Sequence, residues 1–252
     1  MNIGMISRVL WRRRALRRRE RWTRAELLEH QQRELAILRT FASEQSPFYR
    51  HLHSGLERAP LHELPVLTKA MLMDNFDALS TDSAVRRGRL QAYLDDLTTN
   101  NLFAGRYWVS ATSGSSGRKS IIPTDAHEWA MMIASYGRAN EWAGIRAGLT
   151  HPVSMAVVSS TTAWHQSSRV AATVRSPLIA SQRLDAASPL PDIVARLNQI
   201  QPDVLIAYAS MIKALAYEQL SGRLHIAPRA VNSSSEVLTA DARATALRAW
   251  QV

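Results

Sequence analysis

The chain has 252 residues, of which 46% are hydrophobic and 21% are charged, with ten Gly and ten Pro. This composition is typical of globular proteins and excludes collagen-like, low-complexity and wholly disordered chains. Cysteine is absent, which excludes disulfide scaffolds, thiolate metal sites and cysteine nucleophiles. No stretch approaches the roughly 18 apolar residues that span a bilayer. The first basic run follows the apolar residues at the start of the chain, whereas a signal peptide has the opposite order. We therefore expect a soluble, cytoplasmic protein.

The net charge of +10 is concentrated near the start of the chain. Residues 1–50 contain 12 Arg and 5 Glu, a net of +7, whereas residues 51–252 contain 19 basic and 16 acidic side chains, a net of +3. Trp11, Ala15 and Trp22 follow one another at steps of four and seven, which predicts one stripe of a basic helix over residues 8–24. Such a helix suits nucleic acid, an anionic membrane surface or an acidic partner. Alternatively, it is a solvated helix whose tryptophans pack on its own protein, and nothing in it predicts a specific nucleic-acid partner.

Helix signals continue after this basic run. Thr23 and Glu26 have the spacing of a capping box, which predicts a helix over residues 24–42 that ends before Ser46-Pro47. We therefore treat residues 1–45 as a basic helical arm. Three histidines follow, but no carboxylate is placed to complete a site with them, so we expect no metal site at His51, His53 and His62.

From residue 107 onward, short apolar runs alternate with helical stretches. The predicted strands cover residues 107–110, 153–158, 203–208 and 229–233. The predicted helices begin near Asp125, Pro191, Ser210 and Thr239. Regular alternation of this kind predicts an α/β fold, with a mostly parallel sheet and helices on both of its faces, preceded by the N-terminal helical arm.

The loop SATSGSSGRKS, residues 110–120, is rich in hydroxyl groups and glycine. Gly114 and Gly117 accept backbone angles closed to other residues, so that successive N–H groups can converge on an anion. Arg118 and Lys119 add positive charge, and the composition suits a polyphosphate. The spacing is not that of a Walker loop, a nucleophile elbow or a dinucleotide fingerprint. A flexible Ser/Gly connector is the alternative interpretation.

The sequence TSGSSGRKS resembles the phosphate loop of the adenylate-forming enzymes, and most specifically of the phenylacetate–CoA ligase-like family. Three further stretches are similar to segments of that family in the same order: SPFYRHL with LPVLTKAMLMDNFD, then QPDVLIAYASMIKALA, then VNSSSEVLTADAR. The last resembles the turn that lies against adenine. Together the matches cover about residues 46–245.

The resemblance implies a role for each matching position. The β- and γ-phosphates of ATP would be bound by Thr112, Ser113, Gly114, Ser115, Ser116, Gly117, Arg118 and Lys119, with Arg118 in place of the family's lysine. The turn beside adenine would be formed by Ser234, Ser235 and Glu236. The pocket for the carboxylate substrate would be lined by Trp164, His165, Tyr208 and Ser210, although an ordinary loop histidine is an equal alternative for His165. The cofactors implied are ATP and Mg²⁺, with CoA as the acceptor.

Two positions depart from the family pattern. Lys119 stands where these loops commonly have proline, and three serines, 233–235, replace a glycine-rich turn. The family's Tyr-Gly-x-Thr-Glu motif, whose glutamate helps to hold Mg²⁺, would begin just beyond Val252. We therefore assign no catalytic residue and no metal ligand, and expect residues 46–252 to be an incomplete N-terminal domain of an adenylate-forming enzyme, without the C-terminal lid domain.

Whether this chain is itself an enzyme stays open at this point. The leading hypothesis is ATP-dependent activation of a carboxylic acid as acyl-adenylate, followed by transfer to a thiol such as CoA. One form of this hypothesis is that the chain is a truncated and inactive ligase. A non-catalytic nucleotide- or ligand-binding homologue is the first alternative. A protein that binds nucleic acid or a membrane surface through its basic arm is the second. The acyl substrate and the oligomeric state are not predicted.

Overall fold

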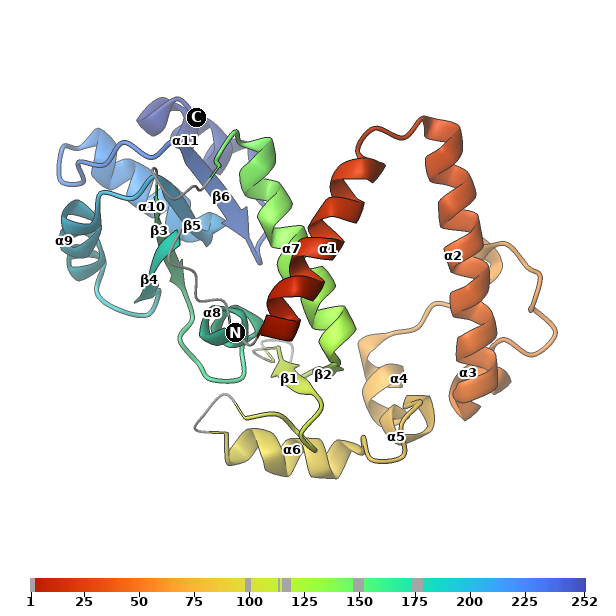
Figure 1. Ribbon diagram of the computed structural model, residues 1–252. Coiled ribbons are helices and arrows are strands. Elements are labelled where there is room, and N and C mark those ends of the chain that lie inside the picture. Colours follow the sequence, from red (N-terminus) through yellow and green to blue (C-terminus); the bar gives the residue numbers. More distant parts are fainter. Residues whose placement is uncertain (1–2, 98–100, 113, 115–118, 147–151, 174–178) are drawn as a thin grey trace. The chain divides into compact units, whose positions relative to one another are not determined.

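The computed structural model describes residues 3–97, 101–112, 114, 119–146, 152–173 and 179–252 (Figure 1). They form two compact units, one of Leu10–Ala130 and one of Met131–Val252 together with Met1–Val9. Two helices, α1 (Ile3–Arg19) and α7 (Ala126–Trp142), contain the boundaries between the units. None of the helices in the described ranges is long and apolar enough to cross a membrane.

Helices make up most of the unit Leu10–Ala130. Its elements after α1 are α2 (Arg24–Gln45), α3 (Pro47–Leu52), the 3₁₀ turn Leu61–Glu63, α4 (Lys69–Asp74), α5 (Phe76–Leu79) and α6 (Arg87–Asp95). The predicted capping box at the start of α2 is confirmed, since the Thr23 N–H donates to the Glu26 carboxylate (2.7 Å) and the Glu26 N–H donates to Thr23 Oγ1 (3.3 Å). Ser46 then ends α2 and caps α3.

The prediction that Trp22 shares one helical stripe with Trp11 and Ala15 is wrong. Helix α1 ends at Arg19, and Trp22 lies in the turn that precedes α2. There the Trp22 ring packs edge-on against the His30 ring, with centroids 5.0 Å apart. The reason is local: the capping box of Thr23 starts a new helix at Arg24, so the chain has to leave the first helix before it.

The unit Met131–Val252 is built on a parallel four-stranded sheet. The strands are β3 (Val153–Ser159), β4 (Ile179–Asp185), β5 (Val204–Tyr208) and β6 (Ala230–Ser234), in the spatial order β4-β3-β5-β6. This confirms the predicted α/β class. The sequence did not predict β4 or the preceding helix α8 (Gln166–Thr173).

Helices α9 (Leu190–Ile200), α10 (Ala209–Leu220) and α11 (Ala240–Trp250) pack on one face of the sheet (Figure 1). The core on this face includes Val158 and Leu205 from the strands and Leu197 and Leu215 from the helices, all with no exposed surface. The other face is apolar near the amino ends of the strands, where Val153, Met155, Val204 and Ala230 cluster with Ile145. Helix α7 contacts this second face, because Asn232 of β6 donates to Asn140 (3.1 Å).

A short antiparallel hairpin belongs to the unit Leu10–Ala130. Its strands are β1 (Trp108–Ala111) and β2 (Ile121–Thr124), which pair Trp108 with Thr124 and Ala111 with Ile121. The first strand was predicted one residue too early. Between the strands lies the hydroxyl-rich loop, so the hairpin fixes the positions of the two ends of that loop.

Candidate functional site

The order in which the chain adds strands to the parallel sheet reverses at β3. From β3 the chain moves to β4 on one side, and from β4 it crosses to β5 on the other side. In sheets of this kind, ligands bind outside the carboxyl ends of the strands at the point where the order reverses. The edge between the carboxyl ends of β3 and β5 is therefore the place in this unit where a site is expected.

Every strand of the sheet ends in a polar residue at that edge. The last residues are Ser159 in β3, Asp185 in β4, Tyr208 in β5 and Ser234 in β6. Ser159 pairs with Asp185 and Tyr208 pairs with Ser234, so the four lie in one row across the sheet. Because side chains alternate between faces, this polar row lies on the same face as the apolar cluster of Val153 and Val204. That face thus changes from apolar to polar toward the carboxyl edge.

Hydrogen bonds join the segments that leave β3, β4 and β5. The Ser160 N–H donates to the Tyr208 hydroxyl (2.9 Å), and the Arg183 guanidinium donates to the Ser160 carbonyl (2.7 Å) and to Ser168 Oγ of α8 (3.0 Å). Partial burial lowers the pKa of the Arg183 guanidinium, which Tyr208 and Asp185 partly counteract. These contacts hold the backbone after β3 against the neighbouring strands.

Asp185 completes the network at the end of β4. Its carboxylate accepts hydrogen bonds from the Thr161 hydroxyl and from the Ala187 N–H (3.0 Å). The Thr161 bond first, then the Ala187 bond and the charge of Arg183, lower the pKa of this carboxyl. Asp185 and Arg183 were missed by the sequence reasoning because β4 itself was missed. The sequence LIASQRLD, residues 178–185, offers only a weak strand signal, because few of its residues are large and apolar.

The predicted pocket residues come from two segments that end at this same edge. Trp164 and His165 lie between β3 and α8, half-buried, with their ring centroids 6.5 Å apart in an edge-on arrangement. Tyr208 ends β5, and Ser210 lies in the first turn of α10. The hydrogen bond from Ser160 to Tyr208 ties the first segment to the second. Their assignment to a carboxylate pocket stays a prediction.

The residues predicted to lie beside adenine form a turn at the end of β6. Ser234 is the last residue of the strand, and Ser235 has a left-handed backbone with φ of +64°. One oxygen of the Glu236 carboxylate accepts a hydrogen bond from the Ser210 N–H (2.8 Å). Glu236 therefore caps α10 with a negative charge near its N-terminus, which is favourable. The turn thus holds together two segments that the sequence assigned to separate roles, and its contact with adenine stays a prediction.

The described ends of the hydroxyl-rich loop are pinned to each other. The Thr112 N–H donates to the Ser120 carbonyl and the Ser120 N–H donates to Thr112 Oγ1, both at 3.0 Å. Gly114 has φ of +75°, a backbone conformation that favours glycine and agrees with the reason given for this residue. Lys119 is exposed. The other predicted phosphate-binding residues lie outside the described residues: Ser113, Ser115, Ser116, Gly117 and Arg118.

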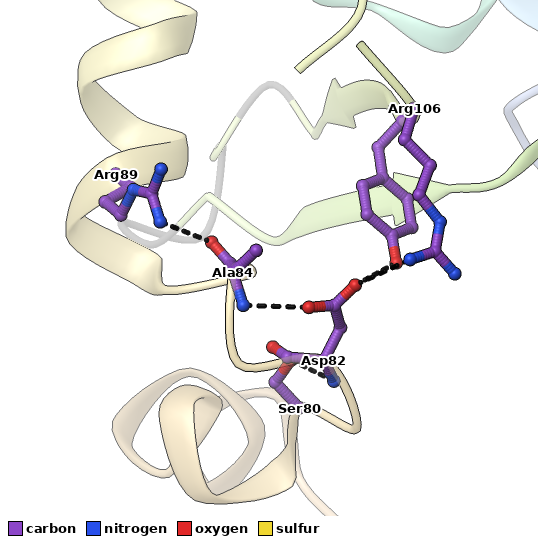
Figure 2. A network of polar contacts seen from close by, with 6 residues as sticks. Ser80, Asp82, Ala84, Arg89 and Arg106 are labelled. Atoms are coloured by element: carbon purple, nitrogen blue, oxygen red, sulfur yellow. Dashed lines mark hydrogen bonds and ion pairs between the residues drawn. The ribbon is translucent and has the colours of Figure 1, made fainter. Parts of the chain in front are cut away.

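Polar contacts anchor the start of the hairpin (Figure 2). Asp82 accepts hydrogen bonds from the Tyr107 hydroxyl (2.6 Å) and the Ala84 N–H (2.8 Å), and Arg106 lies 3.1 Å from the same carboxylate. These bonds lower the pKa of the Asp82 carboxyl, with the bond from Tyr107 as the largest cause. Burial, and then the bond to Asp82, raise the pKa of Tyr107 to about 12. Tyr107 directly precedes β1, so this contact fixes where the hairpin begins.

A stacked tryptophan pair joins the hairpin to helix α7. Trp108 of β1 and Trp129 of α7 lie with ring planes 3° apart and centroids 5.2 Å apart, and Trp129 is completely buried. The helix predicted to begin near Asp125 is confirmed, and a capping box fixes its start, because the Glu128 N–H donates to Asp125 (2.9 Å) and the Asp125 N–H donates to Glu128 (2.8 Å). The stack thus packs β1 on α7, and β2 is followed directly by the capped start of α7.

Comparison with solved structures relates this fold to a CoA ligase. The structure of 2-hydroxyisobutyryl-CoA ligase with 2-HIB-AMP and CoA in the thioesterification state matches 80% of this chain and 41% of its own, with 20% identity and a TM-score of 0.55. An open conformation of that ligase, with the same ligands, matches 75% of this chain and 39% of its own, with 19% identity and a TM-score of 0.51. At such identities the similarity shows a shared fold.

The sequence comparisons do not assign this chain to a family. No family model matches the sequence, and no curated protein matches it. The chain spans about two fifths of the length of the ligase structures that it matches, at 41% and 39%. The similarity therefore shows a fold shared with part of this ligase, and the likeness to the adenylate-forming enzymes and to the phenylacetate–CoA ligase-like family stays a prediction.

Proposed function

We propose that this chain carries the ATP- and carboxylate-binding part of an AMP-forming acyl-CoA ligase. In this reaction, a carboxylate oxygen attacks the α-phosphorus of ATP and pyrophosphate leaves. A thiol such as that of CoA then attacks the acyl carbon of the acyl-adenylate, and AMP leaves as the thioester forms. The observation that carries the proposal is the glycine- and hydroxyl-rich loop, pinned at Thr112 and Ser120, in a chain with the fold of a ligase crystallised with an acyl-AMP and CoA. The acyl group itself is left undefined.

The proposed role of the loop is to hold the pyrophosphate that leaves. Backbone N–H groups around Gly114 and Gly117, with the hydroxyls of Thr112, Ser113, Ser115 and Ser116, would donate to the β- and γ-phosphates. Arg118 and Lys119 would neutralise their charge. Fixed donors and cations of this kind stabilise charge that develops on the leaving group, without reorganisation during the reaction. The positive φ of Gly114 supports this role, because a left-handed residue is one of the two conformations that alternate in an anion-binding backbone nest.

We propose two further roles for residues of the unit Met131–Val252. We propose that the turn of Ser234, Ser235 and Glu236 contacts adenine, and that Trp164, His165, Tyr208 and Ser210 line the carboxylate pocket. The support is their position at or next to the polar carboxyl edge of the sheet, on either side of the point where the strand order reverses.

Mg²⁺ is assigned no protein ligand in this chain. Within the described ranges, no group of three or more Asp, Glu or His side chains is placed to hold a metal ion. When bound, Mg²⁺ neutralises phosphate charge, and we expect it to arrive with ATP as the Mg-ATP complex. The residues of this chain then bind and orient the nucleotide.

Calorimetric titration of the full chain with Mg-ATP tests the proposal. We expect saturable binding that is abolished by Gly117→Val. A β-branched side chain would disfavour the backbone angles that glycine allows, and it would also obstruct the approach of phosphate. Gly88→Val is the matched control, since Gly88 lies in α6 with nothing within 4 Å of an added Cβ. Unaltered ATP binding in Gly117→Val would mean that the loop is a connector.

A non-catalytic nucleotide-binding protein is the second candidate. Its support is the presence of Lys119 and of the serine-rich turn 233–235, which depart from the family pattern. Exchange of labelled pyrophosphate into ATP, in the presence of a panel of carboxylic acids, separates the two candidates. ATP binding without exchange would favour the second.

A further inference from the structure

The outer face of α1 presents a cationic surface that the proposed ligase function does not use. Residues 10–21 contain seven arginines and one glutamate, a net of +6. Successive residues of a helix are rotated by about 100°, so Leu10, Arg14 and Arg17 of α1 project in similar directions, and Arg21 lies in the turn that follows α1. Leu16, about 120° away from Leu10 on the same helix, is buried. The arginines therefore cover a side of the helix other than the one it buries.

These arginines surround a shallow surface hollow. It has a volume of about 390 Å³ and is lined by Leu10, Arg13, Arg14, Arg17, Arg18 and Arg21. All of these residues except Arg13 are exposed. Guanidinium groups donate several hydrogen bonds in a fixed plane and pair well with phosphate. The hollow thus suits a phosphate-bearing surface.

Large apolar side chains lie next to the arginines on the same helix. Leu10 is 56% exposed and Trp11 is 63% exposed. The Arg12 guanidinium lies 4.9 Å from the centroid of the Trp11 ring, as a cation over an aromatic face. Earlier on this helix, Ile3 and Ile6 are also exposed, and they fall on the stripe of Leu10. The exposed stripe is therefore apolar in its first turns and cationic in its last turns.

We propose that α1 docks this protein on an anionic lipid bilayer, as a peripheral contact. Arginines would pair with lipid phosphates, while Leu10 and Trp11 would enter the boundary between headgroups and acyl chains, where tryptophan is favoured. Nucleic acid offers phosphates but no apolar layer, so it would leave the exposed leucine and tryptophan without a role. The combination of exposed cations and exposed apolar side chains on one helix favours a membrane surface.

Sedimentation of the full chain with lipid vesicles tests this inference. The vesicles contain phosphatidylcholine with about 30 mol% phosphatidylserine, at about 0.15 M salt. We expect binding to these vesicles and little binding to pure phosphatidylcholine. Equal binding to both kinds of vesicle, or no binding to the anionic ones, would overturn the proposal.

Two double variants separate the cationic and apolar contributions. Arg17→Gln with Arg18→Gln should weaken partitioning about 25-fold, because each cation near an anionic surface contributes a factor of about five. Its matched control removes two arginines from α11, Arg243→Gln with Arg248→Gln, and should change partitioning far less. Both control arginines are exposed.

Leu10→Ser with Trp11→Ser should weaken partitioning at least tenfold, because two large apolar side chains lose their burial. The matched control is Ile37→Ser with Leu38→Ser on α2, an adjacent pair that is 58% and 61% exposed. Circular dichroism checks that each variant keeps its helix content. Trp11→Phe, which keeps an apolar ring, should retain most of the binding.

Binding to duplex RNA, measured in parallel, decides between the two kinds of phosphate surface. Vesicle binding that is unaffected by Leu10→Ser with Trp11→Ser, together with equally tight RNA binding, would overturn the membrane proposal and assign the arginines to nucleic acid. Vesicle binding that falls equally in the α2 control would show that α1 is not the contact.

Discussion

The parallel sheet and the β1–β2 hairpin are stabilised in different ways. The sheet packs on α9, α10 and α11 through side chains such as Leu205 and Leu215, which have no exposed surface. The hairpin has strands of only four residues and is positioned by a few specific contacts, those of Tyr107 with Asp82 and of Trp108 with Trp129. The sheet therefore depends mainly on apolar packing, whereas the hairpin combines the buried side chains of Val109 and Ile121 with a polar anchor and a stacked aromatic pair.

Truncation in the centre of the sheet should give the largest effect. Leu205→Ala removes a completely buried side chain from β5, and we expect a loss of about 2–5 kcal/mol in the free energy of unfolding. Chemical denaturation measures this loss. The same change at Leu247, which is 45% exposed on α11, should cost less than about 0.5 kcal/mol. Similar costs at both positions would contradict the assignment of the core.

Removing one hydroxyl should loosen the hairpin without affecting the sheet. Tyr107→Phe keeps the ring and loses the hydrogen bond to the Asp82 carboxylate, and we expect a local loss of about 1.5 kcal/mol. Hydrogen exchange at residues 108–111 should become faster, whereas exchange in β5 should not change. Tyr217→Phe on α10, at a residue 47% exposed, is the control. Equal acceleration in β5 would mean that the two regions are not independent.

Low pH should weaken the same anchor. The pKa of the Asp82 carboxyl is lowered in the folded protein from an ordinary value of 3.8. A lowered pKa stabilises the fold at pH values above the ordinary one, and this contribution is lost as pH falls through the folded value. The difference in stability between the natural chain and Tyr107→Phe should therefore be constant from about pH 5 to 8 and shrink below about pH 4. A difference that grows on acidification would show that the pair acts in another way.

The smallest effect is expected where the turn after β6 meets α10. Glu236→Gln keeps an oxygen for the Ser210 N–H but removes the negative charge at the start of the helix. We expect a loss of about 0.5–1 kcal/mol, seen as faster hydrogen exchange at the Ser210 amide. This loss should shrink at high salt, because the residue is exposed. A loss independent of salt would point to packing instead of charge.

Sequence patterns predicted three strands of the sheet, β3, β5 and β6, and missed the edge strand β4. Strands β3 and β5 carry continuous apolar runs because neighbours cover them on both sides, and both were predicted within one residue. Strand β4 lies at the edge, and its sequence IASQRLD is half-buried or exposed throughout, so no apolar run marks it. Helix α8, QSSRVAAT, has only eight residues, and valine is its one large apolar residue, so it gives little signal in the sequence.

Prediction of the candidate site shows the same division. The positions of Tyr208, Ser210 and Ser234 followed from the ends of predicted strands and helices. Arg183 and Asp185 did not, because their strand was not recognised. The bond from Ser210 to Glu236 joins residues far apart in the sequence, and no spacing in the chain predicts it. Local signals thus locate the segments, while tertiary contacts decide which of them meet.

The ratio of ATP affinity to AMP affinity tests the central claim most directly. If the loop between β1 and β2 holds the β- and γ-phosphates, Arg118→Ala should weaken ATP binding by about ten- to a hundredfold, as expected for a charge-assisted contact. AMP binding should stay unchanged, because AMP lacks both of those phosphates. Calorimetric titration of the natural chain and the variant with each nucleotide gives the four affinities. Equal losses for ATP and AMP, or no loss for either, would contradict a phosphate-binding loop.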